Sequence, residues 1–473
     1  MNELPATGSH IHLIAICGVG MASLAGLLKD QGYRVTGSDQ NVYPPMSTYL
    51  AQAGIDVQNG FNAQHLADRP DLVIIGNAVS RSNPEAEAVL DGRIPYLSFP
   101  QALGKFLIGA RQSIVVTGTH GKTTTTALAA WVLKRAGLDP GFFVGGVPLN
   151  FGSGWDRGES DQVVLEGDEY DSAFFDKGPK FLHYRPQSVI LTSVEFDHAD
   201  IYRDLDHLKE AFRALAQLIP VSGTLVACYD YPAAREVVKA GSCRVVSYGD
   251  DENCDWTVRT VRTEGRRSYF DPCFRKFNEG TVELGAIGRH NVKNALGVYV
   301  LARELGMDRS KLLEGFASFS GVKRRQEFKG ESRGVLVIDD FAHHPTAVAE
   351  TIKAVKDAFT GRRVWAVFEP RSNTSRRNIF EREFALSLSL ADRVVVSCLH
   401  QPEKIPEAER LSVERVVESI NKSAGHEQGI VINGADNIAA HVAAHASAGD
   451  IILVMSNGAF DGVQDKILSG LAS

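Results

Sequence analysis

The pattern of hydrophobic and polar positions along the chain alternates short apolar runs with longer amphipathic stretches. Near the N-terminus, the apolar runs IHLIAIC and DLVIIGNAV lie on either side of the helical pattern MASLAGLLKDQGY. Apolar runs of about four to eight residues separated by helical patterns are typical of βαβ units. Such units place their strands side by side in a parallel sheet. We therefore predict a parallel α/β sheet in the first part of the chain.

The same pattern starts again twice. SIVVTGTHGKTTTTALAAWVLKRAG predicts a strand, a glycine-containing loop and a helix, and GVLVIDDFAHHPTAVAETIKAVKDAF opens a third series. The shorter runs from CRVVSYG to TVELGAIG predict antiparallel strands attached to the second series, and the charged segment GVKRRQEFKGESRG predicts a linker or hinge. A chain of 473 residues exceeds what one hydrophobic core usually supports. We predict three α/β domains: a Rossmann-like domain at 1–110, a P-loop ATPase-like domain at 111–325 and a second Rossmann-like domain at 326–473.

The composition narrows the class of protein. With 44% hydrophobic and 23% charged residues the chain resembles ordinary globular proteins, and no apolar run approaches the roughly 18 residues that span a bilayer. The start of the chain has no basic stretch followed by a long apolar one, and the six cysteines are scattered. We therefore expect a cytoplasmic protein with reduced thiols. The net charge of −7 argues against nucleic acid or an anionic membrane as a partner.

The strongest local signal is a glycine-containing loop between a predicted strand and a predicted helix. Backbone N–H groups in such a loop surround phosphates, a lysine neutralises their charge and a threonine hydroxyl reaches Mg²⁺. Only two residues separate the glycines, where the usual pattern has four, so a chance loop stays an alternative. The candidate phosphate-binding residues are Gly118, Thr119, His120, Gly121, Lys122, Thr123 and Thr124.

An earlier glycine-rich turn, Gly18-Val19-Gly20-Met21, follows the first predicted strand, and Asp39 closes the next one. Glycines here permit the close approach of a diphosphate, and an acid about 20 residues on is suited to bind a ribose. A nicotinamide dinucleotide and another diphosphate-bearing nucleotide are both compatible with this pattern. Structural packing without a ligand is the third alternative.

Two acidic motifs follow strands of the second series: Glu166-Gly-Asp168-Glu169-Tyr-Asp171 and Glu195-Phe-Asp197-His198-Ala-Asp200. Because the carboxyl ends of parallel strands meet at one edge of a sheet, these groups should lie near the phosphate loop. Mg²⁺ prefers oxygen ligands together with phosphate partners. Either motif taken alone is more often a solvated loop, whereas the two together predict a metal site.

Later segments supply further candidates. His290, Asn291 and Asn294 open a predicted helix and are suited to read an adenine edge, although Asn291 as an ordinary helix cap is equally compatible. The run Lys323-Arg324-Arg325 lies between two predicted domains, either as a solvated charge run or with an arginine that reaches a transferring phosphate.

Two motifs of the third series end consecutive predicted strands: Asp339-Asp340-Phe-Ala-His343-His344 and Phe368-Glu-Pro-Arg371-Ser372-Asn373. Both should therefore lie at the same sheet edge and face a cleft. A buried packing role for His343 is the alternative.

Taken in order, GTHGKTTT, EGDEYD, VEFDHAD, GRHNVKNA, GVKRRQE and DDFAHHP resemble the Mur ligase family and span nearly the whole chain. ICGVGMASLAGL and GSD resemble the branch that adds alanine to UDP-N-acetylmuramate. NVYPPMSTYL, EPRSNTSRRNIF and MSNGAFDGVQDKIL instead resemble the branch that attaches a released murein peptide. The alanine-adding branch is expected to have Tyr at Phe341 and a His-Arg pair at Arg371-Ser372, so a peptide is the expected acceptor.

The resemblance implies an ATP- and Mg²⁺-dependent ligase of peptidoglycan recycling. It would join the lactyl carboxylate of UDP-N-acetylmuramate, through an acyl phosphate, to the tripeptide L-Ala-γ-D-Glu-meso-diaminopimelate, or to a tetra- or pentapeptide. Catalysis would rest on Lys122, Glu166, His198, Arg325 and His343, with Thr123 and Glu166 as ligands of one Mg²⁺ and His198 as a ligand of a second. Asp340 would join the nucleotide-binding residues. The resemblance implies these substrate-binding residues: Gly18, Val19, Gly20, Met21, Asp39 and Ser80 for the UDP-sugar, and Arg371, Ser372 and Asn373 for the peptide.

Three other functions remain open from the sequence. The nearest is a UDP-N-acetylmuramate–L-alanine ligase. A dinucleotide-dependent oxidoreductase would use the first glycine-rich turn but leaves GTHGKTTT without a role. A non-catalytic ATP-binding regulator would use that loop without turnover.

Overall fold

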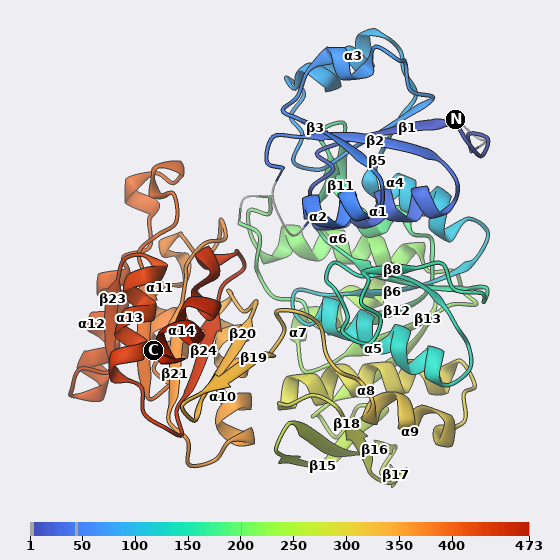
Figure 1. Ribbon diagram of the computed structural model, residues 1–473. Coiled ribbons are helices and arrows are strands. Elements are labelled where there is room, and N and C mark those ends of the chain that lie inside the picture. Colours follow the sequence, from blue (N-terminus) through green and yellow to red (C-terminus); the bar gives the residue numbers. More distant parts are fainter. Residues whose placement is uncertain (1–3, 43–45, 200, 473) are drawn as a thin grey trace. The chain divides into compact units, whose positions relative to one another are not determined.

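The computed structural model describes residues 4–42, 46–199 and 201–472 (Figure 1). Residues 43–45, in the peptide-branch stretch after Asp39, and Asp200 of the second acidic motif lie outside the described residues. The chain divides into two compact units. The first contains Met1–Glu195, Asp206–Thr257 and Leu296–Gly315, and the second contains Phe196–Leu205, Val258–Ala295 and Phe316–Ser473. None of the helices in the described part of the chain combines the length and apolar character needed to cross a membrane.

The first unit begins with a parallel sheet of strand order β3-β2-β1-β4-β5. Its helices α1 and α3 lie on opposite faces of the sheet (Figure 1). The residues from Ile11 to Ile14 are therefore all buried, including the polar His12, because both faces of β1 are covered. The elements are β1 (His10–Ile14), α1 (Val19–Asp30), β2 (Arg34–Asp39), α2 (Met46–Gln52), β3 (Asp56–Asn59), η1 (Ala63–Leu66), β4 (Leu72–Ile75), α3 (Pro84–Asp91), β5 (Tyr96–Ser98), α4 (Phe99–Leu103) and η2 (Gly104–Ile108).

The direction of the strand order changes at β1, because β2 and β3 follow on one side of it and β4 and β5 on the other. In open parallel sheets such a switch point leaves a crevice at the carboxyl ends of the two central strands, and ligands bind there. The glycine-rich turn follows β1, and the loop containing Ser80 follows β4. The fold thus places the two predicted UDP-sugar segments on the two sides of this point.

The second sheet of the first unit has the strand order β14-β13-β12-β6-β9-β7-β8, and all neighbours are parallel except β7 and β8. The run CRVVSYG forms β14 parallel to β13, so the prediction of an antiparallel strand there was wrong. The hydrophobic pattern of this run shows that it is a strand but not whether the strand is parallel or antiparallel to its neighbour. That depends on which strand it pairs with in the folded sheet. The elements are β6 (Gln112–Thr117), α5 (Lys122–Arg135), β7 (Gly141–Phe143), β8 (Trp155–Asp156), β9 (Gln162–Gly167), β10 (Asp171–Ala173), β11 (Asp176–Pro179), η3 (Lys180–His183), β12 (Pro186–Leu191), α6 (Leu205–Leu218), β13 (Thr224–Cys228), α7 (Pro232–Val237), η4 (Val238–Ala240), β14 (Arg244–Gly249) and α9 (Arg309–Ala317).

Four of the described elements cross the boundary between the units: α6 and α9, whose bounds are given above, β15 (Trp256–Glu264) and α8 (Arg289–Glu304). Within the second unit, β16 (Arg267–Phe274) pairs antiparallel with β17 (Phe277–Asn278) and β18 (Val282–Leu284). The predicted antiparallel strands are thus present after β15.

The main sheet of the second unit has the order β19-β20-β24-β21-β22-β23 and is parallel except for β19. The predicted linker is in part this edge strand, β19, because its alternating residues pair with β20. The elements are β19 (Glu327–Ser332), β20 (Val335–Asp340), α10 (Pro345–Ala358), β21 (Val364–Phe368), η5 (Asn378–Phe380), α11 (Glu381–Leu388), β22 (Arg393–Ser397), η6 (Pro402–Lys404), η7 (Glu407–Glu409), α12 (Val413–Ala424), β23 (Gly429–Ile432), α13 (Ala435–His445), β24 (Ile451–Met455), η8 (Phe460–Gly462) and α14 (Val463–Ala472).

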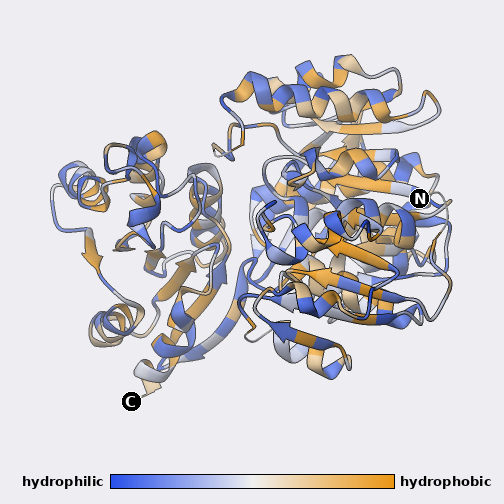
Figure 2. Cartoon of the chain, turned by 90° about the horizontal axis from the view of Figure 1, so that it is seen from above, coloured by the Kyte–Doolittle hydropathy of each residue, from blue (hydrophilic) through white to orange (hydrophobic). Residues whose placement is uncertain are grey.

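Successive residues of the central strand β24 belong to the two different cores of this sheet. Ile451, Leu453 and Met455 pack with α10, α11 and α12, whereas Ile452 and Val454 pack with α13 and α14. The strands accordingly appear as mainly apolar arrows, and the helices carry both apolar and polar faces (Figure 2). Helices on both faces of parallel sheets confirm the predicted α/β class.

Candidate functional site

The loop between β6 and α5 has a backbone that favours glycine at two positions. Gly118 has φ 130° and Gly121 has φ 78°, both in the region that favours glycine. A Cβ atom on Gly118 would lie 2.3 Å from Thr192 Oγ1. Immediately afterwards α5 begins at Lys122, so its free N–H groups lie at the loop. The glycine spacing differs from the usual pattern but still yields a tight turn into a helix N-terminus, which suits a phosphate.

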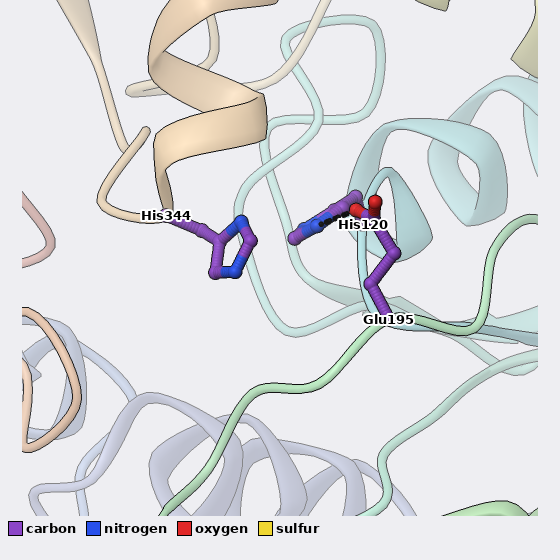
Figure 3. Close-up of side chains that lie close together, drawn as sticks. All are labelled: His120, Glu195 and His344. Atoms are coloured by element: carbon purple, nitrogen blue, oxygen red, sulfur yellow. Dashed lines mark hydrogen bonds and ion pairs between the residues drawn. The ribbon is translucent and has the colours of Figure 1, made fainter. Parts of the chain in front are cut away.

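The loop is held against the chain that follows β12. Thr119 Oγ1 donates to the Glu195 carbonyl at 2.9 Å and accepts from the Glu195 N–H at 2.9 Å. The His120 N–H donates to Ser193 Oγ at 2.9 Å, and the His120 imidazole lies 2.8 Å from a Glu195 carboxylate oxygen (Figure 3). Thr119 and His120 therefore have structural partners that preorganise the loop. Glu195 lies in the second acidic motif, which was predicted as part of a metal site and not as a partner of this loop.

The threonine run after Lys122 is explained by local bonding. Thr125 and Thr126 donate their hydroxyls to the carbonyls of Gly121 and Lys122, each at 2.8 Å. Such bonds to the preceding turn satisfy hydroxyls that would otherwise be buried without partners. Thr124 is half-buried in the first turn of α5 and remains a predicted phosphate ligand.

The Lys122 ammonium group has a carboxylate partner, Glu169, that was not predicted from the sequence. Its Nζ lies 2.8 Å from a Glu169 oxygen and donates to the Gly118 carbonyl at 2.8 Å. Burial lowers the pKa of Lys122, but Glu169, Asp168 and Glu166 outweigh it, so the pKa stays above its usual value. Glu169 itself is fully buried. Lys122 is thus protonated, and its ammonium group lies beside the predicted phosphate-binding loop.

Thr123 and Glu166, two predicted Mg²⁺ ligands, are in contact. Thr123 Oγ1 donates to Glu166 Oε1 at 2.8 Å, and Glu166 Oε2 accepts from the Gly145 N–H at 2.7 Å. Adjacent oxygens around an octahedral Mg²⁺ are about 3 Å apart, given Mg–O distances of about 2.1 Å. A hydroxyl and a carboxylate at this separation, next to a phosphate loop, are a suitable partial donor set for Mg²⁺.

His198 belongs to the second unit and adopts φ 59°. Its N–H donates to Asp197 Oδ1 at 2.7 Å. Burial raises the pKa of Asp197, but His198, His343 and His344 together hold it well below its usual range. Within this unit the two predicted residues His198 and His343 therefore share an ionised carboxylate. Asp197 was quoted in its motif but not predicted as their partner.

His343 is half-buried in the second unit, so the alternative of a buried packing residue holds only in part. Burial lowers the pKa of His343, opposed mainly by Asp197, and its Nδ1 lies 3.0 Å from the Phe341 carbonyl. The Arg325 guanidinium lies over the Phe341 ring at 4.5 Å. A neutral imidazole next to a cation and an aromatic ring is compatible with packing and with a role in the site.

Two of the predicted adenine-binding residues, His290 and Asn291, meet at Gln326 in the second unit. Asn291 Nδ2 donates to the Ile287 carbonyl at 2.8 Å and to Gln326 Oε1 at 3.1 Å, and His290 Nε2 lies 3.4 Å from Gln326 Nε2. Asn291 thus holds the connection before β19 and does not act as an N-cap through its side-chain oxygen. Asn294 is buried one helical turn on.

Asp340 ends β20 beside this network. It accepts from the Gln326 N–H at 2.8 Å and from the Ala342 N–H at 2.7 Å. Burial raises the pKa of Asp340, while Arg325 acts in the opposite direction. Arg325, Asp340 and His290 are therefore brought together within one unit, as their shared prediction requires.

The N-terminal glycine-rich turn has internal partners. Asp39 accepts from the Cys17 N–H and the Asn41 N–H, each at 2.9 Å, so its carboxylate shapes the turn whether or not it contacts a ribose. A Cβ atom on Gly20 would lie 3.2 Å from the Phe99 ring, so close packing already favours glycine there. Gly18 is the residue before α1.

Three further UDP-sugar candidates differ in exposure. Val19 and Ser80 are exposed, and Ser80 Oγ lies 3.1 Å from Ser82 Oγ. Met21 is buried, so its side chain belongs to the core of the first sheet. Only the backbone of Met21 is suited to a ligand.

The predicted peptide-binding residues lie after β21. Arg371 Nη1 is 3.5 Å from a Glu369 oxygen, so the two side chains form an ion pair within this part of the chain. Ser372 Oγ accepts from the Ser375 N–H at 3.0 Å, and Asn373 Oδ1 accepts from Arg376 at 2.7 Å. Ser372 and Asn373 therefore shape the loop, and Arg371, whose side chain is 27% exposed, is the member best suited to meet a ligand.

Family models match nearly the whole chain. Residues 10–111 match the model described as "Mur ligase family, catalytic domain", residues 116–302 the Mur ligase middle domain, and residues 324–458 the model described as "Mur ligase, glutamate ligase domain".

Comparison with individual proteins agrees. The chain is 42% identical over 98% of both chains to the UDP-N-acetylmuramate–L-alanyl-γ-D-glutamyl-meso-2,6-diaminoheptandioate ligase of Escherichia coli. It is 34% identical to a UDP-N-acetylmuramate–L-alanine ligase of Salinibacter ruber, over 97% of this chain and 94% of that one. The crystal structure of a murein peptide ligase from Psychrobacter arcticus matches with 37% identity and a TM-score of 0.73, over 98% of this chain and 99% of that one. The chain belongs to the Mur ligase family, as its six ordered motifs predicted.

Proposed function

We propose that this protein is an ATP-dependent ligase that forms an amide between UDP-N-acetylmuramate and a murein peptide, in peptidoglycan recycling. The observation that carries the proposal is end-to-end identity of 42% with the Escherichia coli ligase, whose name states both substrates. The phosphate loop with a charged lysine supports ATP as the energy source. The tripeptide L-Ala-γ-D-Glu-meso-diaminopimelate is the proposed acceptor.

The proposed reaction has two steps. A carboxylate is a poor electrophile, so it must first be activated. Its oxygen attacks the γ-phosphorus of ATP, ADP departs as the leaving group, and the product is an acyl phosphate. The neutral amine of the peptide then attacks the acyl carbon. Inorganic phosphate departs with the electron pair of the C–O bond, the nitrogen loses a proton and the amide remains.

The residues of the phosphate loop have distinct proposed roles. The backbone N–H groups after Gly118 orient the phosphates, and Lys122 neutralises charge on the γ-phosphoryl oxygens in the transition state. Thr123 and Glu166 would hold Mg²⁺, and an ion held there would supply positive charge to the phosphate oxygens. The roles of His198 at a second metal ion, and of Arg325 and His343 near the reacting groups, rest on the family resemblance.

The main alternative is L-alanine as the acceptor. Identity with the alanine ligase of Salinibacter ruber is 34%, against 42% with the peptide ligase of Escherichia coli. Phe341 and Arg371-Ser372 stand where the alanine-adding branch is expected to have Tyr and a His-Arg pair. Both differences favour the peptide.

A ligation assay tests the proposal. The purified protein receives UDP-N-acetylmuramate, ATP and Mg²⁺ with either the tripeptide or L-alanine, and ADP and the UDP-linked product are measured. We expect ADP and product in equal amounts with the tripeptide and much slower turnover with L-alanine. Fast use of L-alanine without use of the tripeptide would make the protein an alanine ligase. No ADP with either acceptor would instead favour an ATP-binding regulator.

A further inference from the structure

A fully buried carboxylate, Glu85, lies in the first turn of α3 and has no part in the proposed chemistry. Its Oε1 accepts from the Asn62 N–H at 3.1 Å and lies 2.6 Å from His65 Nδ1. Its Oε2 accepts from the Ser38 hydroxyl and lies 3.6 Å from His12 Nε2. Four groups from β1, β2, η1 and the connection before η1 thus converge on one side chain.

The surroundings keep Glu85 ionised. Burial raises the pKa of Glu85, but the nearby His12 ring and the hydrogen bonds of Ser38, Asn62 and His65 outweigh it and leave the pKa below its usual value. A buried charge is costly unless it is fully hydrogen-bonded, so the geometry around Glu85 tolerates little rearrangement. The Glu85 carboxylate therefore fixes the positions of the groups that surround it.

Ser38 connects Glu85 to the glycine-rich turn. Ser38, whose hydroxyl donates to Glu85, accepts the Ala15 N–H at 2.8 Å and the Ile16 N–H at 3.0 Å through its carbonyl. The next residue, Asp39, accepts the Cys17 N–H. The end of β2 thus determines the path of the chain between β1 and α1.

Asn83 connects Glu85 to the loop that contains Ser80. Asn83 caps α3 by accepting from the Glu85 and Ala86 N–H groups at 2.9 and 3.2 Å. The Asn83 N–H in turn donates to the Ser80 carbonyl at 3.1 Å. The loops after β1 and β4, on the two sides of the switch point, are therefore both tied to Glu85.

We propose that Glu85, acting through Ser38, is a positioning residue for the UDP part of UDP-N-acetylmuramate. This inference rests on the proposed function. Glu85 contacts no substrate. It fixes the positions of the glycine-rich turn and the Ser80 loop relative to each other, as binding of a diphosphate and its sugar requires. If these positions become less fixed, the binding of UDP-N-acetylmuramate weakens and the binding of the other substrates does not.

The test compares three variants of the full-length protein. Ser38→Ala removes the hydroxyl that links Glu85 to β2, and Glu85→Gln removes the charge. Ser113→Ala is the matched control, because Ser113 is also fully buried, lies in β6 of the other sheet of this unit and donates its hydroxyl to the Tyr184 carbonyl at 2.6 Å. Calorimetry measures the Kd of UDP-N-acetylmuramate and of a non-hydrolysable ATP analogue, and thermal unfolding measures Tm.

We expect Ser38→Ala and Glu85→Gln to raise the Kd of UDP-N-acetylmuramate by about fivefold to tenfold or more, since one buried hydrogen bond contributes about 1 kcal/mol. The Kd of the ATP analogue and kcat at saturating UDP-N-acetylmuramate should change little. Ser113→Ala should lower Tm without changing either Kd. If Glu85→Gln does not fold, Ser38→Ala still decides the matter.

Two outcomes overturn the inference. Unchanged UDP-N-acetylmuramate affinity in Ser38→Ala refutes the positioning role, and an equal loss in Ser113→Ala shows general loosening of the unit. Failure of the proposed function looks different, because the wild-type protein itself would then not bind UDP-N-acetylmuramate.

Discussion

The Lys122 ammonium group pairs with Glu169, a carboxylate that is fully buried. The lysine therefore has a structural task in addition to its proposed one at the phosphates. Removing one partner of a buried pair leaves the other charge uncompensated, which commonly costs about 3–5 kcal/mol. A loss of activity in a Lys122 variant therefore shows a role in catalysis only if the loss of stability is measured separately.

We predict that Lys122→Ala lowers kcat by about 10²–10³, the usual effect of one lost transition-state contact, and also lowers the free energy of unfolding. The double variant Lys122→Ala/Glu169→Gln should regain most of the stability, because the buried charge is gone, but not the turnover. Urea unfolding and steady-state ADP release measure the two effects. Recovery of turnover in the double variant would exclude Lys122 from the chemistry.

Thr123 and Glu166 give a prediction about metal dependence. Thr123→Val removes the hydroxyl that lies 2.8 Å from Glu166, and Glu166→Gln removes the anionic oxygen. Each should raise the Mg²⁺ concentration needed for half-maximal turnover by about tenfold or more, since outer or inner ligand changes commonly cost about 10–100-fold. Thr123→Ser keeps the hydroxyl and serves as the control. An unaltered Mg²⁺ dependence in both main variants would show that the metal lies elsewhere.

At the scale of elements, Asp450 joins the starts of β21 and β24. It is 4% exposed and accepts from Arg363 Nε at 2.9 Å, Arg363 Nη2 at 2.6 Å, Trp365 Nε1 at 3.0 Å and the Ser447 N–H at 2.9 Å. Burial raises the pKa of Asp450, but Arg363, Ser447 and Trp365 outweigh it, so the pKa is below its ordinary value of 3.8. Parallel strands need such contacts because no hairpin holds their ends together.

We predict that Asp450→Asn lowers the free energy of unfolding by about 2–4 kcal/mol at pH 7, through loss of charged hydrogen bonds. A carboxylate with a depressed folded-state pKa contributes stability above its unfolded-state pKa and loses it as pH falls through the folded-state value. The difference between wild type and variant should therefore be constant at neutral pH and shrink below about pH 4. Urea unfolding across this range measures it, and a difference that is independent of pH would contradict the role of the charge.

Elements were predictable where the local pattern suffices. The strand, glycine loop and helix around Lys122 lie where the sequence placed them, because glycine conformations and helix starts depend on adjacent residues. The direction of β14 and the pairing of β19 were not, because a strand acquires its neighbour only when the sheet assembles. Periodicity shows which face of a strand is buried but not which strand lies beside it.

At the scale of the whole molecule, different parts of the chain carry the groups proposed for different substrates. The phosphate loop and the glycine-rich turn belong to the first unit, and Arg371 belongs to the second. A substitution in one unit can therefore change the use of one substrate and spare the binding of the others.

We predict that Arg371→Ala raises the KM of the tripeptide by about tenfold or more, because a guanidinium–carboxylate contact contributes about 1.5–3 kcal/mol. The Kd values of ATP and UDP-N-acetylmuramate should stay within about twofold, which is well under 1 kcal/mol. Steady-state kinetics and calorimetry measure these constants. Arg376→Lys, in the same loop, is a useful comparison because it disturbs the loop without touching Arg371. If Arg371→Ala leaves the KM of the tripeptide unchanged, Arg371 only pairs with Glu369.

The sequence by itself determined the α/β class, the phosphate loop and the Mur ligase family, because each depends on residues that are close together along the chain or on motifs in a set order. Only the tertiary structure decided which distant groups meet. Glu169 with Lys122, Asp197 with His343 and His344, and Glu85 with Ser38 are such pairs. Their contacts depend on strand order and register, which arise from the packing of complete sheets and leave no local signal in the sequence.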